Sequence, residues 1–104
     1  MIGIGVTTHN RHSVAATTLG EIRKRMPPDA RLAVVDDASA EPPPFEVSYR
    51  FAHNVGIARA KNKCLELLAD CEHIFLFDDD TYPIADCWWV PYCTTNEAHL
   101  MYSF

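Results

Sequence analysis

Short apolar, β-prone segments alternate with segments of helical periodicity along the chain, and this alternation limits the folds open to it. The apolar segments are residues 2–6 (IGIGV), 32–35 (LAVV) and 73–77 (HIFLF). Between them, apolar residues recur every three or four positions over residues 14–26 and 57–69, as in amphipathic helices. Strands that alternate with helices pair in parallel, with helices on both faces of the sheet. We therefore expect an α/β fold, a three-layer α/β/α, Rossmann-like and mostly parallel sheet.

Turn and capping residues mark where these elements end. Ser13 is a suitable N-cap for the first helix, and the pair Pro27-Pro28 prevents that helix from continuing. A proline-rich turn over residues 41–45 leads directly into a further short strand at about residues 48–51. The turn is therefore too short to separate two domains.

Length and composition indicate a single domain over residues 1–104 with one hydrophobic core, since 48% of the residues are apolar. A formal net charge of −5 provides no basic surface for nucleic acid. The four cysteines include no C-x-x-C pair, which argues against a zinc site or a disulfide framework. The sequence shows no leader peptide and no stretch long enough to span a membrane, so we expect a soluble, cytoplasmic protein.

Polar side chains follow each of the three apolar strands, at residues 7–10 (TTHN), 36–37 (DD) and 78–80 (DDD). The carboxyl ends of parallel strands meet at one edge of the sheet, where ligands of α/β proteins bind. Adjacent carboxylates repel one another unless a cation compensates them, and oxygen ligands favour Mg²⁺, Mn²⁺ or Ca²⁺. We expect Asp78 and Asp80 to converge on a divalent metal whose open positions are filled by substrate phosphates.

Four motifs occur in order on these elements: TTHNR (7–11), VVDDAS (34–39), NVGIARAKN (54–62) and FDDDT (77–81). Together they resemble the nucleotide-binding half of the inverting, family 2 glycosyltransferases of the GT-A fold. The resemblance covers residues 2–83, and its specificity lies in the order of the motifs, because a D-x-D motif alone is common. It implies a glycosyltransferase that takes its sugar from a nucleoside diphosphate donor, a UDP-sugar being favoured, and passes it to an acceptor that the motifs do not specify.

The resemblance also implies a role for individual residues. His9 stands where an aromatic residue often stacks on the base, Asp37 accepts a hydrogen bond from the uracil imide, and Asp36 supports Asp37. Arg59 lies near the diphosphate, and Asp80 binds Mn²⁺ or Mg²⁺. The implied nucleotide-sugar-binding residues are Thr7, His9, Asp36, Asp37, Asn54, Gly56, Arg59, Asp78 and Asp79, and the implied metal ligands are Asp78 and Asp80.

Plainer interpretations stand beside these roles. His9 alone is more often an exposed loop residue, and the basic residues of NVGIARAKN and the lysine that follows it are most often a solvated helix face. The pair at 36–37 also fits an Asx-turn before Ser39. Of the two tryptophans, Trp88 and Trp89, we expect one to pack in the core, while the other could line a sugar surface.

Two other functions compete with sugar transfer. A haloacid-dehalogenase phosphatase also uses a D-x-D motif, but there the motif opens the domain and here it comes last. A binding module without catalysis would share every donor-site residue.

No general base is identified, since Asp86 and Glu97 are the only carboxylates after the triplet and neither lies in a base motif. The acceptor half of a GT-A enzyme is not expected within 104 residues, and an unfinished sheet edge would favour a homo-oligomer.

Overall fold

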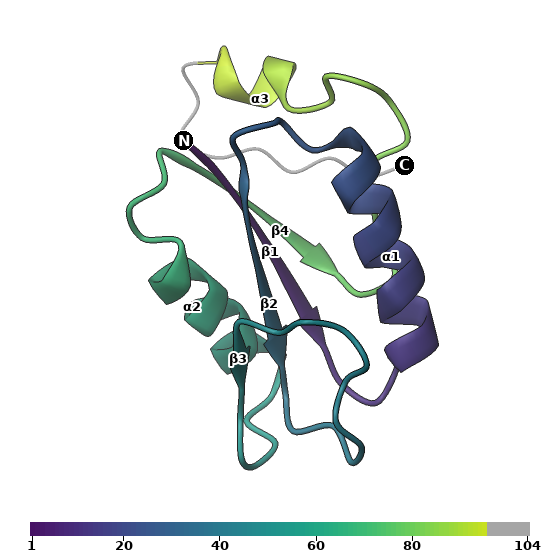
Figure 1. Cartoon of the computed structure of the whole chain (residues 1–104). Helices are drawn as coiled ribbons and strands as arrows, with labels where there is room; N and C mark the ends of the chain where they lie inside the picture. Colours follow the sequence, from purple (N-terminus) through teal and green to yellow (C-terminus); the bar gives the residue numbers. More distant parts are fainter. Residues whose placement is uncertain (96–104) are drawn as a thin grey trace.

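Four strands form one parallel sheet in the order β3-β2-β1-β4 (Figure 1). In this computed structural model, which describes residues 1–95, the strands are β1 (Ile2–Thr8), β2 (Arg31–Asp36), β3 (Tyr49–Arg50) and β4 (His73–Asp78). The helices are α1 (His12–Arg25), α2 (Ile57–Leu67) and α3 (Val90–Cys93). The predicted α/β class with a parallel sheet is confirmed.

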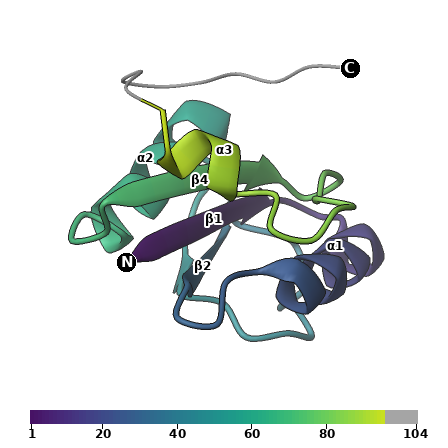
Figure 2. The same cartoon turned by 90° about the horizontal axis from the view of Figure 1, so that it is seen from above.

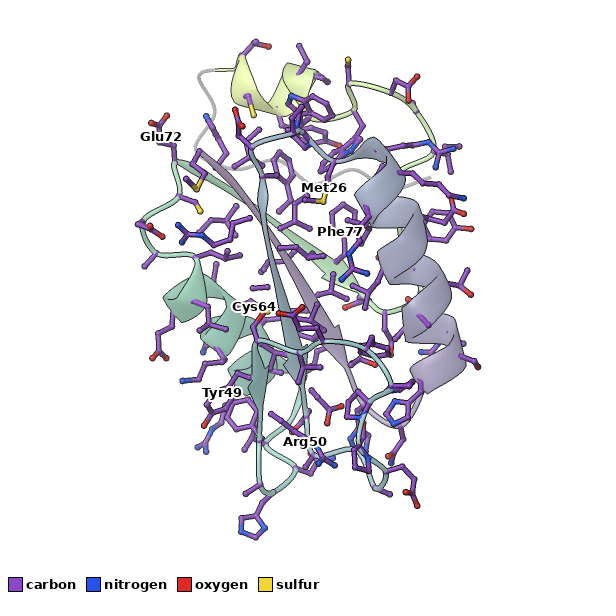
Figure 3. The ribbon with its side chains drawn as sticks, viewed as in Figure 1. Met26, Tyr49, Arg50, Cys64, Glu72 and Phe77 are labelled. Carbon is purple, nitrogen blue, oxygen red and sulfur yellow. The ribbon has the colours of Figure 1, made fainter. Side chains whose placement is uncertain are left out.

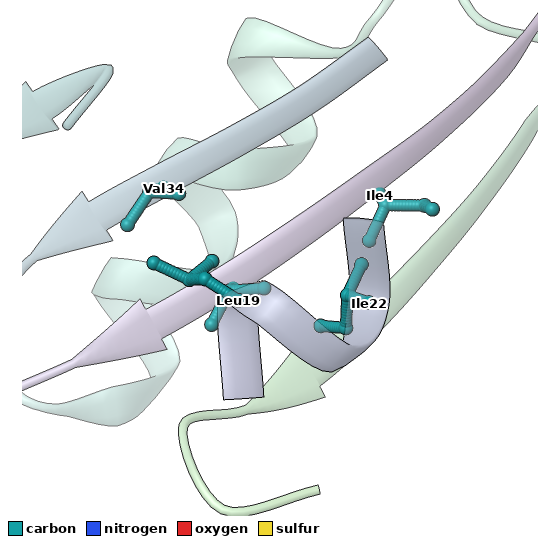
Figure 4. Packing of buried hydrophobic residues seen from close by; sticks show 5 residues of the cluster. Ile4, Leu19, Ile22 and Val34 are labelled. Carbon is teal, nitrogen blue, oxygen red and sulfur yellow. The ribbon is translucent and has the colours of Figure 1, made fainter. Parts of the chain in front are cut away.

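The two longer helices cover opposite faces of the sheet, as Figure 2 shows from above. Because successive side chains of a strand point to opposite faces, β1 supplies both layers. On the α1 face, Ile4 and Val6 pack with Leu19, Ile22 and Val34 in a fully buried cluster (Figure 4). The three-layer arrangement therefore follows from the alternation of apolar residues in a single central strand.

On the other face, α2 packs against β1 at glycines. A Cβ atom at Gly5 would lie 2.8 Å from Cβ of Cys64 and 3.0 Å from a methyl group of Leu76. Cys64 points from α2 toward the sheet (Figure 3), and burial raises the pKa of its thiol to about 11. The absence of a side chain at Gly5 is what allows this close approach.

The ends of several elements differ from the sequence expectation. The predicted N-cap, Ser13, is wrong: the helix begins at His12, two residues before the predicted start, Arg11 is the N-cap, and no side chain caps the helix. The helix ends at Arg25, one residue before the predicted end, because Met26 takes an extended conformation (ψ 153°) before Pro27. The strand expected at 48–51 is reduced to the two residues of β3, and α2 ends at Leu67, two residues before the predicted end.

After β4 the chain passes along the α1 face to α3, a short helix of four residues. The Trp88 ring lies edge-on to Phe75 and Phe77, with centroids 4.8 Å and 5.6 Å away, and its indole N–H donates to the Arg25 carbonyl at 2.9 Å. The prediction that one tryptophan packs in the core is confirmed. The sequence of residues 98–104 (AHLMYSF) also predicts a strand, which lies outside the described residues.

Within residues 1–95, β4 pairs with a strand on one side only, and the expected homo-oligomer stays a prediction. No helix in this part of the chain has the length and apolar character needed to cross a membrane.

Two glycine-to-alanine substitutions test the packing of α2 on β1. Gly5→Ala forces a Cβ against Cys64, and we expect a loss of about 1–3 kcal/mol in the free energy of unfolding, typical of overpacking. Gly20→Ala is the matched control, since Gly20 is exposed within α1 and its Cβ would meet nothing within 4 Å. We expect the free energy of unfolding of Gly20→Ala to rise by about 0.5–1 kcal/mol. Urea unfolding measures both, and a Gly5→Ala protein as stable as wild type would contradict the close approach.

Candidate functional site

The parallel register of the central strands brings the predicted site residues together. Thr7 at the end of β1 lies opposite Asp78 of β4, and Thr8 lies opposite Asp36 of β2. A pocket of about 410 Å³ opens at this edge. After β1 the chain adds β2 and β3 on one side of that strand and then β4 on its other side, and ligands of α/β proteins bind where such a switch of side occurs. Its lining includes Thr7, His9, Asp37, Asn54, Gly56, Asp78, Asp79 and Asp80, together with Thr8 and Arg11.

Asp37 organises the loop before α2. The carboxylate is buried, and its two oxygens accept hydrogen bonds from the backbone N–H groups of Val55 (2.8 Å) and Gly56 (3.0 Å). Gly56 has a φ of +89°, which favours glycine, and it immediately precedes the first turn of α2. A carboxylate has about four lone-pair positions, so Asp37 retains acceptor capacity on its pocket side.

Asp36, the neighbour of Asp37 at the end of β2, is completely buried. It accepts hydrogen bonds from the backbone N–H of Ser39 at 3.1 Å and from Nε of Arg50 at 3.0 Å, and the Ser39 hydroxyl also donates to it. Arg50 also donates to the Ser39 carbonyl at 2.5 Å, which closes the turn after β2. Asp36 does not line the pocket; it supports the turn that carries Asp37.

The middle carboxylate of the triplet is turned into the protein. Asp79 is only 6% exposed, accepts a hydrogen bond from the Thr8 hydroxyl at 2.9 Å and pairs with Nη1 of Arg11 at 3.2 Å. Its backbone carbonyl accepts from the Thr18 hydroxyl at 2.6 Å. Although the sequence grouped Asp79 with the ligand-binding residues, its contacts here join the end of β4 to β1 and α1.

The outer two carboxylates face solvent, with Asp78 50% and Asp80 49% exposed. Lys61 Nζ lies 2.9 Å from Asp78, and Nη2 of Arg11 lies 3.5 Å from Asp80. These two cations compensate the repulsion of the triplet. Ion pairs this exposed contribute little to stability, so both carboxylates can exchange their partner for another cation.

Of the basic residues of α2, Lys61 reaches a carboxylate of the site, where the sequence analysis had favoured Arg59. Arg59 is exposed on α2, does not line the pocket, and has no ion pair within residues 1–95. Lys61 follows the buried Ala60 and precedes the buried Cys64 by three positions, so it lies beside the sheet-facing stripe of α2. This spacing was the signal in the sequence that could have pointed to Lys61. For Arg11 the sequence held no signal beyond its place after β1.

The side chains of this site suit a metal ion that is coordinated partly by the protein and partly by a substrate. Within residues 1–95, no three side chains of the His, Cys, Asp and Glu types are placed to hold an ion by themselves. Asp78 and Asp80 offer two exposed carboxylates, and Mg²⁺ is usually bound by one or two carboxylates plus substrate phosphates. The residues present therefore suit Mg²⁺ or Mn²⁺ held jointly with a phosphate group.

Comparison of the chain with family models, curated proteins and solved structures finds no match in any of the three.

The contrast between Asp79 and Asp80 can be tested by alanine substitution. Asp79→Ala leaves the Thr8 hydroxyl and Arg11 without their buried partner, and we expect a loss of about 1–3 kcal/mol in unfolding free energy. Asp80→Ala, its exposed neighbour, should change stability by no more than about 0.5 kcal/mol. Chemical denaturation of both variants measures the difference. Equal losses would show that Asp79 has no special structural role.

Proposed function

We propose that this domain binds the nucleoside diphosphate-sugar donor of a GT-A, family 2-like glycosyltransferase, with a UDP-sugar as the favoured donor. The observation that carries the proposal is the convergence of four separate motifs on one pocket of about 410 Å³. The motifs come from the ends of β1, β2 and β4 and from the loop before α2. The volume lies within the range typical of small-molecule sites.

The nucleoside end of such a donor would lie against His9 and Asp37. Both line the pocket, and Asp37 is held in place by two backbone N–H groups. A carboxylate so held is a fixed acceptor for an N–H donor such as the imide of uracil. This supports a nucleotide whose base presents an N–H group.

The diphosphate end would lie near Asp78 and Asp80, which also line the pocket. A divalent cation there supplies positive charge that stabilises the leaving nucleoside diphosphate. Lys61 and Arg11 already pair with these carboxylates, so both place a cation where phosphate oxygens would lie. The site therefore offers three sources of positive charge for a ligand that carries a diphosphate.

Sugar transfer also needs a general base for the acceptor hydroxyl. Asp86 is exposed in the loop after β4, and Glu97 lies outside the described residues, so neither is assigned this role. An assay of transfer and hydrolysis with UDP-sugars separates a catalytic domain from a module that only binds the donor.

Calorimetric titration of UDP tests donor binding, first with Mn²⁺ and then with EDTA. We expect binding that requires the metal, and an affinity at least about tenfold lower, or about 1.4 kcal/mol, in Asp80→Asn. Asp29→Asn is the matched control, because Asp29 is exposed before β2, at the opposite edge of the sheet. If Asp80→Asn bound UDP with Mn²⁺ as well as wild type does, the metal role of Asp80 would be refuted; if wild type bound no UDP, the proposed donor would be wrong.

A further inference from the structure

His9 lies where three segments of the pocket meet: the end of β1, the loop after β2 and the loop before α2. Its Nδ1 forms a hydrogen bond with the backbone carbonyl of Asp37. Its Nε2 lies 3.1 Å from Nδ2 of Asn10 and 3.4 Å from Nδ2 of Asn54. One imidazole ring therefore connects all three segments.

Backbone partners fix the orientation of both asparagine amides. Oδ1 of Asn10 accepts a hydrogen bond from the N–H of Ala40 at 2.7 Å. Oδ1 of Asn54 accepts one from the N–H of Gly56 at 3.1 Å. Because a backbone N–H can only donate, the oxygen of each amide must face it, and each NH₂ group must face His9.

These contacts are compatible with one protonation state of the ring. The Asp37 carbonyl can only accept, so Nδ1 of His9 carries a proton. The two NH₂ groups can only donate, so Nε2 presents its lone pair to them. His9 is therefore a neutral imidazole in the Nδ1–H tautomer.

We propose that neutral His9, protonated on Nδ1, is the positioning residue that joins the loop before α2 to the ends of β1 and β2 and so assembles the pocket. The inference rests on the proposed function only for the identity of the ligand. Asp37 acts in the same network, since its carbonyl binds His9 while its carboxylate binds the N–H groups of Val55 and Gly56.

A second proton on the ring has no acceptor in this arrangement. Protonation of Nε2 would direct an N–H at two NH₂ groups, so the imidazolium has to move away from Asn10 and Asn54. The charged groups that line the same pocket are Arg11, Asp37 and the carboxylates of residues 78–80. We expect the pocket to be assembled with neutral His9 and loosened when His9 is doubly protonated.

The tautomer can be measured without any ligand. Long-range ¹H–¹⁵N correlation spectra of the ¹⁵N-labelled protein at pH 7.5 distinguish Nδ1–H from Nε2–H imidazoles, and the signals missing in His9→Asn identify His9. We expect the Nδ1–H pattern. An Nε2–H pattern, or an average of the two tautomers, would overturn the inference.

The positioning role is tested by UDP titration with Mn²⁺ between about pH 5.5 and 7.5, the range in which histidine side chains ordinarily titrate. The amide of His9→Asn can still donate to the Asp37 carbonyl but takes up no proton, whereas His9→Ala loses the donor as well. We expect the affinity at pH 7.5 to fall more in His9→Ala than in His9→Asn. On acidification, wild type should lose up to about tenfold more affinity per pH unit than His9→Asn does.

Comparison with His9→Asn removes the titration of the nucleotide and of the other pocket groups, which are common to both proteins. His73→Asn is the matched control, since His73 begins β4 at the opposite edge of the sheet, and it should follow the wild-type profile. Identical pH profiles for wild type and His9→Asn would overturn the inference.

The exchange rates of the Val55 and Gly56 amide protons give a reading that needs no nucleotide. We expect their protection to fall on acidification in wild type and to stay constant in His9→Asn, after correction for the intrinsic pH dependence of exchange. If UDP does not bind but the tautomer and the amide protection behave as stated, the proposed donor fails and the role of His9 stands. Unchanged protection in wild type would overturn that role.

Discussion

The parallel pairing of β1 with both β2 and β4 is the constraint on which the rest of the structure depends. It places Thr7 opposite Asp78 and Thr8 opposite Asp36, so that three strands end at one edge of the sheet. The same strand directs Ile4 and Val6 toward α1, and on its other face Gly5 lies against Cys64 of α2. Core and pocket therefore share one central strand, and its register sets both.

Seen together, the five aspartates of this edge divide into two groups. The buried carboxylates of Asp36, Asp37 and Asp79 bind backbone N–H groups, hydroxyls or arginines, and they hold loops to the sheet. Asp78 and Asp80 remain about half exposed and pair with single cations. A buried charge needs a complete set of partners, whereas an exposed charge can exchange them. This division leaves the two ends of the triplet available to a ligand while its middle residue secures the fold.

The apolar periodicity was sufficient to predict the fold class and most of the elements, because burial on one or two faces leaves a repeat of 3.6 or 2 residues in the chain. It was insufficient at the ends of helices, as at Ser13, where no side-chain cap forms. It was also insufficient for the basic residues of α2: the spacing of Lys61 places it beside the buried stripe, but only the structure shows that Lys61 reaches Asp78.

By itself, the sequence determined that strands and helices alternate and that polar residues follow each strand, while the nucleotide-sugar site that its motifs suggest stays a prediction. Only the tertiary structure decided which of those polar residues face the pocket. It turned Asp79 inward, brought Lys61 to Asp78, and enclosed His9 between Asn10 and Asn54. The reason is physical: hydrogen-bond direction and burial depend on partners that are distant in the chain, and no local pattern encodes them.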